Sequence, residues 1–134
     1  MIAPGDKGQS GRALILFAHG SREAGWVDPL EDLAERVRAA APGRQVRLAF
    51  LELMHPDLAE AVAELAGRGV GQICVVPIFL GPGGHLRRDL PRMIEELGTR
   101  HPGVMIECAR PVGEGDSVLE AMAAYCVEQL RQPD

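Results

Sequence analysis

The sequence predicts an α/β fold in which a four-stranded parallel sheet lies between two layers of helices. Four short apolar segments alternate with four segments of helical periodicity, and such alternation produces parallel strands joined by right-handed crossovers. The first and third segments are nearly continuous in Val, Ile and Leu, which is typical of strands buried on both faces, so we place them at the centre. The expected strands are Ala13–Ala18, Val46–Leu51, Ile73–Leu80 and Val104–Ala109.

The first two helices carry start and stop signals. Asp28 is the expected N-cap of the first helix, with Pro29 at the first helical position and Glu31 completing a capping box. The second helix is expected to begin near residue 56 and to end at Gly67 or Gly69.

The other two helices are expected after the third and fourth strands. The third is expected to stop at Gly98, and Pro91 in its interior predicts that 85–89 is either a separate turn or the start of a kinked helix. Ser117 and Glu120 predict a capping box for the fourth helix. That helix is expected to pack a set of apolar side chains: Val118, Leu119, Met122, Cys126 and Leu130.

Composition narrows the class of protein. The chain has 134 residues, which fits a single domain, expected at 13–131 after a disordered, glycine-rich tail at 1–12. Its formal net charge of −5 argues against general nucleic-acid binding. No apolar run approaches the roughly 20 residues that span a membrane, and the tail lacks the hydrophobic stretch of a signal peptide. We expect a soluble, cytoplasmic protein whose three cysteines, Cys74, Cys108 and Cys126, are reduced and buried.

Two histidines directly follow the two central strands. His19 opens the segment His-Gly-Ser-Arg at 19–22, and His85 ends a glycine-rich segment at 81–85. Because the carboxyl ends of parallel strands form the ligand crevice of an open sheet, both imidazoles are expected in one cleft. Imidazole binds metals and titrates near neutral pH, so the cleft suggests metal or proton chemistry. The alternative is that each histidine packs at a strand end and bonds to the backbone.

Other polar residues lie near these loops. Glu52 follows the second strand, and two imidazoles with one carboxylate make an open site for a divalent first-row metal, although a solvated glutamate would show the same spacing. Asp89 is expected to cap a helix, and Arg87 and Arg88 form either a solvated face or an anion clamp. The remaining histidines each precede a proline and indicate turns or helix starts: His55 and His101.

Together these segments resemble the short CbiX-type sirohydrochlorin chelatases, class II metal chelatases of tetrapyrrole synthesis. The resemblance runs from about Ala13 to Leu130. It rests on residues 17–22 (FAHGSR), 50–52 (FLE), 76–80 (VPIFL), 84–85 (GH) and 89–91 (DLP) in this order and spacing.

The resemblance implies a chelatase-like, flavodoxin-like three-layer α/β/α fold. It also implies insertion of Co²⁺, with Fe²⁺ or Ni²⁺ as alternatives, into sirohydrochlorin by a homodimer, with the metal as substrate and no tightly bound cofactor. His19, Glu52 and His85 would handle the metal, and the two histidines would be the catalysts that also accept pyrrole protons. The expected substrate contacts are Gly20, Ser21, Arg22, Gly83 and Gly84.

Two other functions fit the same residues. A non-catalytic metal- or tetrapyrrole-binding protein, similar to a metallochaperone, would use the histidines for binding without turnover. A small flavodoxin-like regulatory module would bind an anion at the glycine-rich loop instead.

Overall fold

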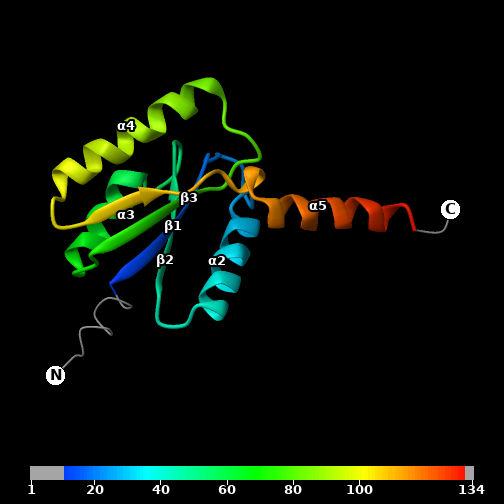
Figure 1. Ribbon diagram of the computed structural model, residues 1–134, viewed down its shortest axis with the longest axis horizontal. Helices are drawn as coiled ribbons and strands as arrows, with labels where there is room; N and C mark the ends of the chain where they lie inside the picture. The colour runs from blue at the N-terminus through cyan, green and yellow to red at the C-terminus, as the bar shows by residue number, and fades with distance from the viewer. Residues whose placement is uncertain (1–10, 132–134) are drawn as a thin grey trace.

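One parallel sheet of four strands organises the protein. In the computed structural model, which describes residues 11–131, the strand order is β2-β1-β3-β4 (Figure 1). The prediction that the first and third strands are central is therefore confirmed. The strands are β1 Arg12–Ala18, β2 Gln45–Phe50, β3 Gln72–Pro77 and β4 Met105–Cys108.

The parallel register places the carboxyl ends of the central strands together. Phe17 in β1 aligns with Ala49 in β2 and with Pro77 in β3. β3 ends at Pro77, three residues before the expected Leu80, although the Ile78 N–H still donates to the Phe17 carbonyl of β1 at 2.8 Å. Residues that follow β1, β2 and β3 consequently begin at the same edge of the sheet.

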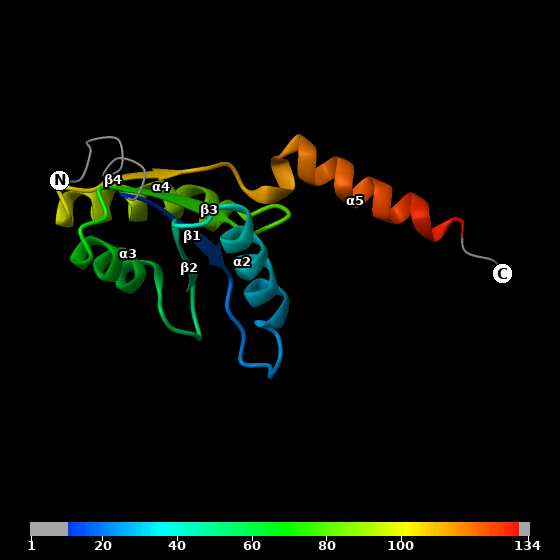
Figure 2. The same ribbon diagram turned by 90° about the horizontal axis from the view of Figure 1, so that it is seen from below.

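Helices cover both faces of the sheet, although unevenly. α3 and α4 lie on one face and α2 on the other, while α5 leaves the body of the domain (Figure 2). The helices are α2 Asp28–Ala40, α3 Leu58–Gly67, α4 Gly84–Arg100, the 3₁₀ turn η1 Val112–Glu114 and α5 Asp116–Gln129.

Two apolar clusters hold these layers. The larger lies under α3 and α4 and includes Ile15, Phe17, Leu65 and Val75, all essentially inaccessible to solvent. The smaller lies under α2 and contains Leu16, Ala34 and Val46. Burial of these apolar side chains is the main driving force for assembly of the layers.

Helix caps differ in part from the sequence prediction. The capping box of α3 is present, because the Asp57 carboxylate accepts from the Glu60 N–H and the Glu60 carboxylate accepts from the Asp57 N–H, both at 2.8 Å. The prediction for α2 is wrong: Asp28 is already helical, and Val27 is the N-cap, with no side-chain hydrogen bond. The capping box of α5 is also wrong, since Gly115 is its N-cap and Ser117 lies inside the helix.

α4 continues beyond the expected stop. It runs through Pro91 and Gly98 to Arg100 as one helix, so residues 85–89 form its beginning. Glycine in a helix costs about 1 kcal/mol. Burial of Leu90 and Leu97 on the core outweighs that cost, and Pro91 lies on the exposed side.

α5 does not pack as the sequence predicts. None of its residues is buried, and Leu119 and Leu130 are exposed.

The prediction that the cysteines are buried is wrong for two of them, because Cys108 and Cys126 are exposed and only Cys74 is half-buried. All three thiols are free, and burial raises the pKa of Cys74.

The domain boundary shifts slightly. Residues 1–10 of the tail expected at 1–12 lie outside the described residues. Arg12, the last residue of that expected tail, belongs to β1. Within 11–131, no helix is both long enough and apolar enough to cross a bilayer.

Candidate functional site

His19 is the first residue after β1, and it lies beside Glu52. Backbone hydrogen bonds continue the pairing beyond the strands, from the Leu51 N–H to the Ala18 carbonyl at 2.8 Å and from the Glu52 N–H to the His19 carbonyl at 3.1 Å. His19 Nε2 then lies 3.2 Å from Glu52 Oε1, with 57% and 54% of the two side chains exposed. The two loops therefore present an accessible imidazole–carboxylate pair.

Gly20 makes this arrangement sterically feasible. Its φ is +101°, a region that side chains other than glycine rarely adopt, and a Cβ there would lie 1.9 Å from the Glu52 carbonyl oxygen. Glycine is thus required at position 20 because the loop after β1 lies directly against the backbone of Glu52.

His19 and His85 share one cavity of about 430 Å³. His85 is the second residue of α4, and Gly83 is the N-cap of that helix. The prediction that both imidazoles meet in one cleft is confirmed by this lining. The cavity is otherwise mainly apolar and is completed by Leu51, Phe79, Gly81, Pro82, Gly83, Leu86, Asp89 and Met93.

Asp89 belongs to this cavity, which corrects its interpretation as a helix cap. It is the sixth residue of α4, and residues four apart lie on the same face of a helix, so Asp89 lies one turn beyond His85. The spacing of four residues between His85 and Asp89 places them on one face only if residues 85–89 are helical, and the sequence also allowed a separate turn there.

The glycine-rich loop before α4 is sterically open. A Cβ at Gly81, Gly83 or Gly84 would contact nothing within 4 Å. Packing within the described residues therefore does not require glycine here, unlike at Gly20.

The other expected substrate contacts have different surroundings. The Ser21 hydroxyl oxygen accepts from the Glu23 N–H at 3.0 Å, which shapes the loop after His19. Arg22 is exposed and, among residues 11–131, forms no hydrogen bond or ion pair. Arg87 pairs with Glu114 at 2.8 Å and so ties α4 to η1. Of these cations, Arg22 is the better placed to meet an anion.

The three expected metal ligands are not preassembled. Within the described part of the chain, no group of three His, Cys, Asp or Glu side chains converges closely enough to hold an ion. Glu52 contacts His19 but does not line the cavity that His19 shares with His85. The structure therefore brings His19 together with Glu52 in one contact, and His19 together with His85 in one cavity.

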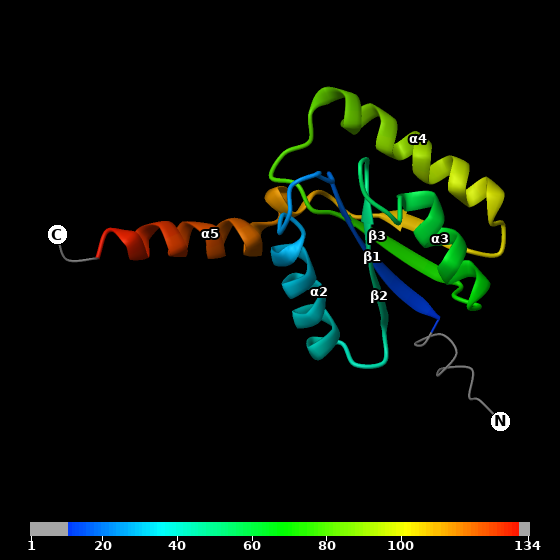
Figure 3. The same cartoon turned by 180° about the vertical axis from the view of Figure 1, so that it is seen from behind.

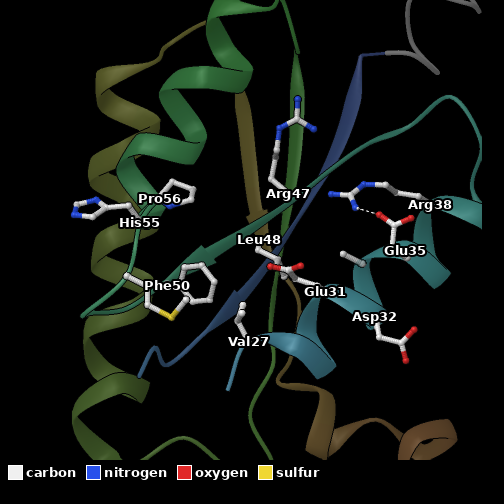
Figure 4. A pocket seen from close by; sticks show the side chains of 12 residues that line it. Val27, Glu31, Asp32, Glu35, Arg38, Arg47, Leu48, Phe50, His55 and Pro56 are labelled. Carbon is white, nitrogen blue, oxygen red and sulfur yellow. Dashed lines mark hydrogen bonds and ion pairs between the residues drawn. The ribbon is translucent and has the colours of Figure 1, made fainter. Parts of the chain in front are cut away.

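A second cavity, of about 510 Å³, lies between α2 and β2 (Figure 4). Glu35 and Arg38 pair on its α2 side, and His55 lies at its rim beside Pro56. His55 Nδ1 is 2.7 Å from Glu60 Oε1, and this hydrogen bond raises the pKa of His55. His55 thus supports the start of α3 and takes no part in the cavity of His19 and His85.

Comparison with known proteins agrees with this geometry. The model of the CbiX family matches residues 13–129. The chain belongs to the CbiX family. A sirohydrochlorin cobaltochelatase of Sulfurisphaera tokodaii is 33% identical over 118 residues, which cover 88% of this chain and 93% of that protein.

Solved CbiX-like structures share the fold. A protein from Marinobacter aquaeolei VT8, described as a cobalamin (vitamin B12) biosynthesis CbiX protein, has a TM-score of 0.78 and 39% identity, covering 89% of this chain and 94% of that one. The sirohydrochlorin chelatase SirB from Bacillus subtilis subspecies spizizenii, in complex with cobalt, has a TM-score of 0.73 and 25% identity. That match covers 87% of this CbiX chain but 50% of SirB.

Proposed function

We propose that this CbiX-family chain inserts a divalent metal, Co²⁺ in the first place and Fe²⁺ or Ni²⁺ as alternatives, into sirohydrochlorin. The observation that carries the proposal is that His19, directly after β1, and His85, in the first turn of α4, line one largely apolar cavity. Relatives of matching length are named sirohydrochlorin cobaltochelatases. The metal is a substrate, so the protein needs no tightly bound cofactor.

Insertion requires that two pyrrole protons leave as the metal enters. A neutral imidazole binds a metal or takes up a proton through the same lone pair. His19 and His85 serve both purposes, with the metal presented from the protein side of the cavity. Asp89 supplies a carboxylate in the same cavity, one helical turn from His85, and is a further proton acceptor.

Glu52 acts on the metal mainly through His19. If Nε2–H of His19 points to the Glu52 carboxylate 3.2 Å away, then Nδ1 keeps its lone pair for the metal or a proton. Glu52 is therefore a positioning residue that also adds negative charge where a divalent ion approaches.

The macrocycle is held by the loops around the cavity. Sirohydrochlorin carries several carboxylates, and Arg22 is an exposed cation next to His19 that suits carboxylate binding. Gly20 and Ser21 lie in the same loop. Gly83 and Gly84, whose missing side chains leave open space, allow the flat ring to approach the backbone.

The decisive experiment follows the absorbance of sirohydrochlorin with Co²⁺, corrected for the spontaneous rate. We expect His19→Ala and His85→Ala each to remove most insertion while unfolding free energy stays within about 1–2 kcal/mol, because both side chains are exposed. His55→Ala is the matched control, since this histidine is exposed and lies outside the cavity. A folded double variant of His19 and His85 that inserts Co²⁺ at the wild-type rate would refute the proposal.

A second experiment addresses the role of the imidazoles as bases. Activity is expected to fall at acid pH, since protonated imidazole neither binds a metal nor accepts a proton. The same absorbance assay distinguishes a non-catalytic metal- or tetrapyrrole-binding protein, which would bind both ligands but would not accelerate insertion in a single turnover.

The proposal extends to assembly and compartment. We infer a homodimer, because one chain offers a small, open cavity to a large macrocycle and two-fold dimers are the commonest oligomers. We also infer a cytoplasmic enzyme that binds neither nucleic acid nor membranes. Three free cysteines suit a reducing compartment.

A further inference from the structure

The turn η1 contacts both ends of the segment that leads to His85. At one end, the Gly113 N–H donates to the Phe79 carbonyl at 2.9 Å. At the other end, the Glu114 carboxylate pairs with Arg87, in the first turn of α4, at 2.8 Å. Figures 1 and 3 show η1, the orange turn directly before α5, beside the path from β3 to α4. We call these two contacts, made by consecutive residues of η1, the η1 bridge.

The first contact of the η1 bridge brings two backbones close together. A Cβ on Gly113 would lie 1.9 Å from the Leu80 carbonyl oxygen and 2.4 Å from the Leu80 Cα. Both distances are far shorter than an ordinary contact, so only glycine allows η1 to lie against this backbone. The close contact fixes the point at which the segment leaves the sheet.

η1 is itself tied to the sheet. The Ala109 N–H donates to the Val75 carbonyl at 2.9 Å, which continues the pairing of β4 with β3. The Glu114 N–H donates to the Pro111 carbonyl at 2.9 Å, and the Arg110 guanidinium donates to the Glu114 carbonyl. The position of Glu114 is therefore set from β4, and its ion pair links α4 to this edge of the sheet.

The segment between the two contacts has little support of its own. Cβ atoms added at Gly81, Gly83 or Gly84 would contact nothing within 4 Å, and glycine gives the backbone wide conformational freedom. Of residues 84–87, only Leu86 packs on the main core, and it is half-buried. The first turn of α4 therefore depends on the η1 bridge for its position relative to β1.

We propose that Glu114 is a positioning residue for His85. Its ion pair with Arg87, two residues along α4 from His85, fixes the first turn of the helix and so the distance between the imidazoles of His85 and His19. Glu114 does not line the cavity that the two histidines share, so it acts through α4 and not on the metal. This inference rests on the proposed function, because it requires both imidazoles to act on one ion.

An ion pair that adds little stability can have this effect. The side chains of Arg87 and Glu114 are 57% and 33% exposed, and ion pairs at such sites contribute little to folding. Bonds from imidazole nitrogen to a first-row metal such as Zn²⁺ are about 2.0–2.1 Å long, so two histidines bind one ion only at a narrowly defined separation. Misplacement of a reacting group by about 1 Å can cost about 100-fold in rate. We therefore expect loss of the pair to affect metal insertion far more than stability.

The test exchanges the two charges of the pair. Arg87→Glu and Glu114→Arg each place like charges opposite one another, and the double variant restores an ion pair in the reverse sense. We expect each single variant to lower kcat for Co²⁺ insertion into sirohydrochlorin at least about threefold, with KM for sirohydrochlorin within about twofold of wild type. The double variant should recover at least about half of the lost kcat. Glu35→Arg is the matched control, since it breaks the ion pair of Glu35 with Arg38 on α2, which is also 2.8 Å long and lies outside the cavity.

Calorimetric titration with Co²⁺ alone gives a measure that does not depend on turnover. Each single variant should bind Co²⁺ at least about threefold more weakly than wild type, with recovery in the double variant and unchanged melting temperatures.

Three results would overturn the positioning role: a single variant with wild-type kcat and Co²⁺ affinity, a loss confined to KM, or a double variant no better than the single ones. A loss confined to KM would indicate that Arg87 binds a carboxylate of the macrocycle instead. If Co²⁺ binding follows the expected pattern but the wild type inserts no metal, only the proposed function is refuted.

Discussion

Substitution of Gly20 by alanine tests how the site is built. An alanine at φ +101° costs roughly 1–2 kcal/mol in backbone strain. Its Cβ would also lie 1.9 Å from the Glu52 carbonyl oxygen, where ordinary contact needs 3.4 Å or more, so the two segments must separate. That movement weakens the hydrogen bond from Glu52 to His19, worth about 1 kcal/mol, and adds the cost of the displaced backbone. We expect a total loss of about 3–4 kcal/mol.

Gly43→Ala is the matched control, since Gly43 has φ +84° but a Cβ there would contact nothing within 4 Å. Its unfolding free energy should fall only by the backbone strain of the alanine, about 1–2 kcal/mol. Urea unfolding gives the difference directly, and thermal unfolding should show Gly20→Ala melting at least about 6 °C below the control. Equal stability of the two variants would refute the close approach of these loops.

Three further results are expected. Glu52→Gln should slow Co²⁺ insertion more than it weakens sirohydrochlorin binding, as measured by absorbance titration, because it removes charge beside His19 without removing a macrocycle contact; equal losses would argue against a positioning role. Asp89→Asn should slow insertion while the circular dichroism and the melting temperature stay unchanged, and an unaffected rate would exclude Asp89 as a proton acceptor. The Glu64 carboxylate has its pKa lowered from 4.5 to about 2, chiefly by hydrogen bonding to Arg47 and then to Arg68. Its stabilisation is therefore present above pH 4.5 and lost as the pH falls toward 2. Solvent screening limits it to about 0.2–1 kcal/mol, so Glu64→Gln should flatten urea-derived stability over that pH range.

The sheet could be predicted from the sequence because its signals are local. Strands buried on both faces need continuous apolar runs, and Ala13–Ala18 and Ile73–Leu80 show them directly. α4 and α5 were predicted less well, since their limits depend on distant contacts. α4 continues through Gly98 because the neighbouring Leu97 is buried in the core. α5 is capped by Gly115 and not by Ser117.

The candidate site likewise has one part that could be predicted from the sequence and one part that could not. The placement of His19 and His85 at the same edge of the sheet follows from the adjacency of β1 and β3, which the apolar runs indicated. The direct contact of His19 with Glu52 and the placement of Asp89 in the cavity depend on the paths of loops and on α4 being one helix. No local pattern encodes either, so Asp89 remained a helix cap in the sequence interpretation.

The two histidines are held in different ways, and this difference suits transfer of a metal. His19 is fixed by hydrogen bonds that extend the pairing of β1 and β2, and Gly20 locks that loop against Glu52. His85 lies in the first turn of α4, after a loop in which a Cβ added at Gly81, Gly83 or Gly84 would contact nothing within 4 Å. The separation of the two imidazoles therefore depends on the path of residues 81–84 as well as on the sheet. Under the proposed function, two imidazole ligands from separate segments would form an incomplete set that can yield a metal to a macrocycle, whereas a closed set of four ligands would retain it.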